Sequence, residues 1–357
     1  VDAMAGNVMY PFGKHLRRHR LVWLSGALFL AVLVAGMQAW WQNDRADRTQ
    51  VLAELQRDMA TQLAKSVIQD LDNKVALLEG STLVRLNNAG EALARLEEIY
   101  RAEPKNLKIQ SALADAHLQI GGLMANPFQL HIGQFEEGRE HIRQAYTLYR
   151  NIYAQAPDTA SLMALVRGER FIAAQLVYVE GKMADGLKLE ADRLVQFKGI
   201  EQTLSPGAKS ILGVKYVVIS HILMQMGKLK EAAVGYERAA RLILEPDAPQ
   251  SEFIQERMRK TYDFYAAEHA LFSLANGDFA EAESQAQQII QRNAGRKYWR
   301  YQHTASQANQ ILACIALLGR QDTQAARTYL IEARRIVQSL SEAFPAAVSL
   351  QWALRRF

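Results

Sequence analysis

The stretch Gly227-Lys228-Leu229-Lys230-Glu231-Ala232-Ala233, continuing through Tyr236 and Ala239-Ala240 to Pro246, has the pattern of one helix turning back into another. A glycine can end a helix in a left-handed conformation that a Cβ atom disfavours. The apolar residue two positions later is placed to plug the turn, and the alanines allow the second helix to approach the first closely. We therefore predict a helical hairpin whose turn lies at Gly227.

The same pattern of a glycine, a polar residue and an apolar residue before a helix occurs five times beyond residue 80. The glycines are 48, 46, 50 and 42 residues apart and stand at Gly133, Gly181, Gly227, Gly277 and Gly319. One hairpin leaves an apolar face uncovered, so neighbouring hairpins must stack to complete a core. These units resemble tetratricopeptide repeats, although their spacing exceeds the usual period of about 34 residues. The resemblance implies an all-α, tetratricopeptide-like solenoid over residues 80–357.

The composition agrees with an almost purely helical protein that buries a large core. The chain has 8 prolines in 357 residues and 49% hydrophobic residues, and its long runs of Ala, Leu, Gln, Glu and Arg favour helices. The single cysteine, Cys314, lies in the apolar stretch 311–317. It has no partner for an intramolecular disulfide, and we expect it to be a small buried hydrophobe.

Upstream of the repeats, the segment Leu21–Trp41 carries no charge and follows a basic cluster that ends at Arg20. A helix of this length rises about 31 Å, which matches the hydrocarbon thickness of a bilayer. Trp40 and Trp41 then fall at the membrane boundary, where indole rings prefer to lie. We predict a single transmembrane helix over residues 21–41. A cleavable signal peptide and a long buried core helix are the alternatives.

Charge predicts the orientation of this span. Residues 1–20 contain four Lys or Arg residues and one acid, so they are expected to form a cytoplasmic juxtamembrane tail at the inner membrane, with the repeats in the periplasm. Most of the net charge of +5 comes from this tail and is therefore no sign of nucleic-acid binding. Apolar residues recur every four positions from Val51 to Val75, which predicts a stalk helix over residues 42–79. A homodimer formed through this helix remains an open alternative.

A more particular likeness covers residues 10–190. The sequence Gly80-Ser81-Thr82-Leu83-Val84-Arg85 follows the predicted span and the basic run 12–20. These features resemble the C-terminal half of bacterial transmembrane Ser/Thr protein kinases, which carry a Gly-Ser-Thr-x-x-Arg signature at this place. Leu83 stands where that family commonly has proline. Further landmarks of the family correspond to Leu93-Ala94-Arg95-Leu96, Glu103-Pro104, Leu113-Ala114-Asp115-Ala116, the linker 121–127 and Ile132-Gly133.

This resemblance implies the sensor or scaffold half of a receptor-type kinase, with its catalytic domain upstream of Val1. The chain itself has no Gly-rich phosphate loop, His-Arg-Asp loop or Asp-Phe-Gly motif. Two alternatives remain, a constitutive cell-envelope assembly scaffold and the sensor half of a membrane-bound transcription regulator. From the residues alone, Ser81 and Thr82 are expected to cap a helix that starts near Leu83.

The sequence contains no pattern typical of a catalytic or metal site. It has no Gly-x-Ser-x-Gly nucleophile motif. The histidines are scattered and lack the spacing that metal ligands require. The paired glutamates are expected to lie on solvent-exposed faces of helices. We therefore expect no enzyme activity, cofactor or metal within this chain.

One stretch, 292–301, interleaves four cations with three aromatic residues around a glycine. Trp, Tyr and Arg dominate the energetics of protein interfaces, so this stretch is the candidate surface for a peptide or anionic partner. The candidate residues are Arg296, Lys297, Trp299 and Arg300. The alternative is the start of a repeat helix whose aromatic rings pack inward while its cations face solvent.

Overall fold

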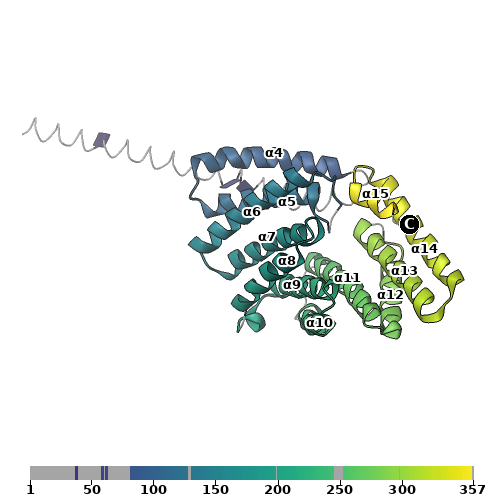
Figure 1. Cartoon of the computed structure of the whole chain (residues 1–357). Coiled ribbons are helices and arrows are strands. Elements are labelled where there is room, and N and C mark those ends of the chain that lie inside the picture. The colour runs from purple at the N-terminus through teal and green to yellow at the C-terminus, as the bar shows by residue number, and fades with distance from the viewer. Residues whose placement is uncertain are drawn as a thin grey trace, which may run out of the picture. The chain divides into compact units, whose positions relative to one another are not determined.

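The computed structural model describes residues 81–355 except 128–129, 198, 245–251 and 297, and also residues 37–38, 58–59 and 61–62. The regular structure of these residues is helical, with no strand, which confirms the all-α class for this part of the chain (Figure 1). The predicted tail, transmembrane helix and stalk fall almost entirely outside the described residues, so they stay predictions.

Twelve α-helices and two short 3-10 helices follow one another in the described residues from 81 onward. Their bounds are α4 Ser81–Ala102, α5 Leu107–Ala125, α6 Phe135–Gln155, α7 Thr159–Tyr178, α8 Met183–Leu194, η2 Val195–Phe197, η3 Glu201–Thr203, α9 Pro206–Gln225, α10 Leu229–Leu244, α11 Glu252–Ala275, α12 Phe279–Asn293, α13 Trp299–Arg320, α14 Thr323–Ala343 and α15 Val348–Leu354.

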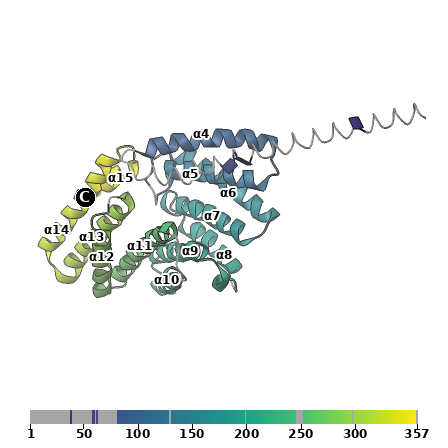
Figure 2. The same cartoon turned by 180° about the vertical axis from the view of Figure 1, so that it is seen from behind.

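The helices pack in the order of the sequence. Helix α4 covers α5, and the pairs α5–α6, α7–α8, α9–α10, α11–α12 and α13–α14 form successive hairpins. Figures 1 and 2 show neighbouring helices side by side along this series. From the second hairpin onward the first helices of neighbouring hairpins also touch, because α9 contacts both α7 and α11, and α11 contacts α13. The five predicted hairpins are therefore present.

Four of the predicted hairpin turns lie at the predicted glycines. Gly133, Gly181, Gly227 and Gly277 have φ angles of +83°, +70°, +76° and +82°, and in each case the next helix begins two residues later. These positive φ values are strained for residues with a side chain, so glycine suits each turn.

The fifth predicted turn is wrong by two residues. Gly319 lies inside α13, and Gln321 adopts the left-handed conformation with φ of +54°. The N–H of Asp322 donates to the carbonyl oxygen of Ala316 at 2.8 Å, as the N–H of Lys182 donates to Leu176 after Gly181. The prediction placed the turn at Gly319 because glycine commonly ends a helix, but here the left-handed residue is Gln321.

Small residues let the paired helices approach closely, as predicted. Four of the five second helices, α6, α10, α12 and α14, bury alanines that are at most 5% exposed, and these are Ala145, Ala232, Ala239, Ala282, Ala286, Ala326 and Ala333. In α10, Ala232 and Ala239 join the largest hydrophobic cluster, which also contains Tyr216 and Tyr236.

Among the described helices, only α9 has the length and composition that could cross a membrane, with a mean hydropathy of 1.3. However, 72% of its apolar window is buried inside the protein, where it packs against α7, α8, α10 and α11. Helix α9 is therefore a core helix of the repeats, and it is a different segment from the predicted span at 21–41.

Two predictions about single residues are wrong. Cys314 is exposed. Two residues span about 200° around an α-helix, so Cys314 lies on nearly the opposite side from the buried Leu312 and Ala316. Ser81 and Thr82 lie inside α4, and their buried hydroxyl groups have no hydrogen-bond partner among the described residues. They therefore do not cap a helix that starts at Leu83.

Candidate partner-binding site

The stretch 292–301 joins the fourth hairpin to the fifth. Helix α12 ends at Asn293, Gly295 turns the chain with φ of +73°, and α13 begins at Trp299. Lys297 lies outside the described residues. The N-cap residue of α13, Tyr298, makes no side-chain capping bond, so this helix begins without the polar side chain that usually accepts from its first N–H groups.

Trp299 lies in the hydrophobic core of the C-terminal part. Its side chain is 6% exposed, and Tyr301 is buried as well. The aromatic rings therefore pack inward, as the alternative interpretation of this stretch expects. The other buried members of the Trp299 cluster are Leu130, Val337, Leu340, Phe344, Ala347 and Leu350.

The two described arginines of the candidate set lie over aromatic rings and are half-buried. The Cζ atom of Arg296 is 4.8 Å from the centroid of the Tyr301 ring, and that of Arg300 is 5.2 Å from the Trp299 centroid. Such cation–π contacts contribute about 0.5–1 kcal/mol at exposed sites. Arg296 Nε also donates to the carbonyl oxygen of Arg292 at 3.0 Å. Both guanidinium groups are thus held close to the start of α13.

Three buried polar atoms at the start of α13 have no hydrogen-bond partner. They are Trp299 Nε1, Arg300 Nε and His303 Nδ1, which find no partner within the part of the chain that the structure describes. The His303 ring centroid lies 6.5 Å from that of Trp299. Leaving such a group unsatisfied costs about 1–3 kcal/mol, so native proteins seldom do it. Burial, with a smaller contribution from the Arg300 charge, lowers the pKa of His303 to about 4. The Trp and Arg groups can only donate, so this place is short of acceptors.

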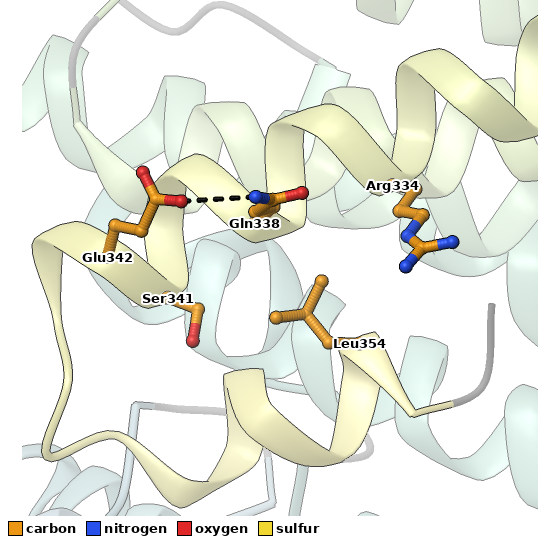
Figure 3. A pocket seen from close by; sticks show the side chains of 5 residues that line it. All are labelled: Arg334, Gln338, Ser341, Glu342 and Leu354. Carbon is orange, nitrogen blue, oxygen red and sulfur yellow. Dashed lines mark hydrogen bonds between the residues drawn. The ribbon is translucent and has the colours of Figure 1, made fainter.

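A surface cavity of about 330 Å³ lies between α14 and α15 (Figure 3). Its lining consists of Arg334, Gln338, Ser341, Glu342 and Leu354, and the Gln338 amide donates to Glu342 at 3.2 Å. The sequence alone does not indicate this cavity, because four of its lining residues are ordinary polar residues of α14. They line a cavity only because α15 folds back on that helix.

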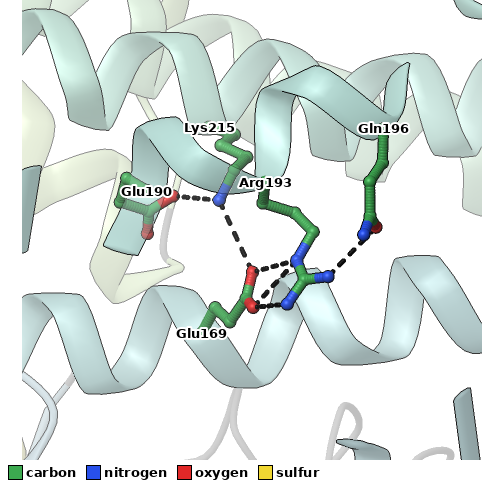
Figure 4. Close-up of polar contacts among 5 residues, drawn as sticks. All are labelled: Glu169, Glu190, Arg193, Gln196 and Lys215. Carbon is green, nitrogen blue, oxygen red and sulfur yellow. Dashed lines mark hydrogen bonds and ion pairs between the residues drawn. The ribbon is translucent and has the colours of Figure 1, made fainter. Parts of the chain in front are cut away.

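A second polar cluster is buried where α7, α8 and α9 meet (Figure 4). Lys215 Nζ lies 2.5 Å from Glu190 and 3.8 Å from Glu169, and Arg193 lies 2.5 Å from Glu169. The two cations balance the two carboxylates, and burial raises the pKa of Glu190. Arg193 also donates to Gln196 at 3.0 Å. Because Glu169, Glu190 and Lys215 are buried and their charges are paired within the cluster, its role is to join three helices. Sequence reasoning missed it, since its members lie on separate helices.

Among the described residues, no three His, Cys, Asp or Glu side chains lie close enough together to hold a metal ion.

No family model and no curated protein matches this chain. Among solved structures, the chain is similar to BtubC (BKLC) from P. vanneervenii, with a TM-score of 0.49 and 14% sequence identity. The match covers 73% of this chain and 92% of that chain.

Proposed function

We propose that residues 80–357 form a tetratricopeptide-like solenoid that binds a protein or peptide outside the cytoplasm. In this proposal the span at 21–41 anchors the solenoid in the inner membrane, and residues 1–20 lie in the cytoplasm. Five hairpins packed in sequence support the solenoid, since each adds one more helix pair to a continuous surface. The basic tail and the uncharged segment behind it support the anchor.

The observation that carries the binding proposal is the shortage of acceptors at the start of α13. A carboxylate from a partner would accept from Trp299 Nε1 and Arg300 Nε, which have no partner here. Arg296 lies in the turn just before α13 and would donate a charge-assisted hydrogen bond to the same partner. Such hydrogen bonds are stronger than those between neutral groups. The ligand class is therefore an acidic peptide segment. The proposed binding residues remain Arg296, Lys297, Trp299 and Arg300.

Peptide selection tests this proposal. The full chain in lipid nanodiscs is used to select from a displayed library of random dodecapeptides, and the enriched peptides are then synthesised for titration. We expect enrichment in Asp and Glu, and at least about tenfold weaker binding to Arg296→Ala and Arg300→Ala, which is about 1.4 kcal/mol. Trp299→Phe keeps a ring in the core while removing the indole donor, and it should also weaken binding.

Arg327→Ala, at an exposed position of α14, is the matched control and should bind like the wild type. Peptides without acidic residues, or equal affinity for all four variants, would show that the surface lies elsewhere on the solenoid.

We propose further that this solenoid is the sensor half of a bacterial receptor-type Ser/Thr protein kinase. The support is the likeness over residues 10–190, including the Gly80-Ser81-Thr82 signature. The upstream reading frame tests this, because it should encode a Gly-rich loop and the His-Arg-Asp and Asp-Phe-Gly motifs. A winged-helix pattern there would favour the transcription regulator instead, and neither pattern would favour the envelope scaffold.

A further inference from the structure

Helix α15 lies against the loop between α5 and α6, although the two are far apart in the sequence. The N–H of Val348 donates to the carbonyl oxygen of His131 at 2.9 Å. The N–H of His131 donates to Ser349 Oγ at 3.5 Å, across 218 positions of the chain. A Cβ on Gly133 would meet Val348 Cγ1 at 3.3 Å, so the loop backbone lies directly on that side chain. Figures 1 and 2 both place α15 beside one end of α4 and away from α9.

The loop also inserts an apolar side chain into the C-terminal core. Leu130 is 3% exposed and shares one cluster with Trp299, Phe344 and Leu350. The same cluster thus contains the first residue of α13, the end of α14, α15 and the loop. Trp299, a member of the candidate binding site, is covered by this arrangement.

Helix α15 depends on these contacts for its order. It has seven residues, and isolated helices shorter than about 12–15 residues are marginal in water. Its N-cap residue, Ala347, offers no side-chain hydrogen bond. It is held by α14 and by the loop 130–133, so loss of the loop contact removes one of these two supports.

We propose that α15 and the loop 130–133 form a latch, and that its release uncovers the candidate site at Trp299 and Arg300. The second half of this inference rests on the proposed function, and the latch itself does not. In the closed state Trp299 Nε1 and Arg300 Nε lack acceptors. An acidic partner would satisfy them only in the open state, and a ligand shifts such an equilibrium through its different affinity for the two states.

Val348→Pro removes the contact between α15 and the loop without directly breaking a hydrogen bond inside α15. Val348 is the first residue of the helix, where proline is well tolerated because its missing N–H has no partner within the helix. Ala347 has φ of −84° and ψ of 94°, the extended conformation that precedes proline. The substitution thus removes the hydrogen bond to His131. Val348→Ala, which keeps the N–H, is the matched control.

The readout is hydrogen–deuterium exchange of the full chain in nanodiscs. In Val348→Pro, the amides of α15 and of residues 130–133 should exchange at least about tenfold faster, while α9 and α10 stay unchanged. Val348→Ala should remain closer to the wild type. Unchanged exchange in both segments would overturn the latch. So would an equal increase in all helices, because α15 would then open only with the whole fold.

A disulfide provides the opposite test. His131→Cys and Ser349→Cys, in a Cys314→Ser background, would join the two sides of the latch when oxidised. We expect oxidation to slow exchange in both segments and to weaken binding of the selected acidic peptides at least about tenfold, and reduction to reverse both effects. Slower exchange with unchanged peptide binding would refute the gating of α13 while the latch itself stands.

Discussion

Among single residues, Lys215 links α9 to α7 and α8 through ion pairs. It is 1% exposed and pairs with Glu190 and Glu169, which are equally inaccessible. Lys215→Met would leave Glu190 buried without its cation, and removing one partner of a buried pair costs about 3–5 kcal/mol. We expect a corresponding loss of stability in thermal unfolding followed by circular dichroism.

Two further variants separate charge from packing at this junction. Adding Glu190→Gln to Lys215→Met removes the uncompensated charge and should recover much of the loss. Lys228→Met, at an exposed ion pair with Glu231, should change stability by less than about 1 kcal/mol. Equal effects of the buried and the exposed substitution would contradict the importance of the network.

Buried histidines predict how stability depends on pH. Burial, together with nearby His141, lowers the pKa of His117 to about 4, and the two Nδ1 atoms lie 2.9 Å apart. The unfolded chain has a histidine pKa near 6.5, so between these values it binds protons that the folded protein does not. Stability should therefore fall as the pH decreases from about 6.5 towards 4. His131 and His303, whose pKa values are also lowered to about 4 by burial, act in the same direction.

The melting temperature at pH 7.5 and at pH 5 measures this effect. His117→Gln removes one titrating group and should reduce the difference between the two values. An unchanged difference in the variant would show that His117 is not the source.

At the scale of elements, Ala232 tests how closely α9 and α10 pack. Its side chain is fully buried, so Ala232→Leu forces extra atoms into a filled interface and should cost about 1–3 kcal/mol. Val234→Leu, at a position of the same helix that is 54% exposed, is the control and should be nearly neutral. If thermal unfolding shows no loss for Ala232→Leu, the helices pack differently.

The fifth turn gives a second test at this scale. Gln321 has a positive φ, which costs a residue with a Cβ roughly 1–2 kcal/mol, so Gln321→Gly should raise the melting temperature. Gly319→Ala should also raise it, because alanine favours the interior of α13 by up to about 1 kcal/mol and its Cβ would only touch Phe279 at 3.4 Å. If Gly319→Ala destabilises the protein, the turn lies where the sequence placed it.

These turns show which parts of the fold can be predicted from local sequence. Gly133, Gly181, Gly227 and Gly277 fix the hairpins because glycine is needed at the residue itself. The turn at Gln321 has no such signal, because a positive φ is uncommon for glutamine. The same limit explains Cys314, because an apolar run shows that a helix is buried but not which of its sides faces solvent.

For the whole molecule, the contacts on which the proposed latch depends join distant segments. The hydrogen bond between His131 and Val348, and the burial of Trp299 beside Leu130, depend on the positions of all the hairpins between them. No local sequence pattern predicts these contacts between distant segments. The stretch 292–301 could be chosen from composition, but its unpaired donors became visible only in three dimensions.

The charge of residues 1–20 predicts the membrane topology of the whole chain. The four basic residues before the span, at positions 14, 17, 18 and 20, should keep the N-terminus in the cytoplasm. Alkaline phosphatase, which is active only outside the cytoplasm, should therefore be active when fused after Phe357, and a cytoplasmic fluorescent reporter at the same place should be dark. Replacing the four basic residues with Gln removes the charge bias and should lower the phosphatase signal. Activity of the cytoplasmic reporter in the unaltered chain would place the repeats in the cytoplasm, where an acidic partner would have to be sought instead.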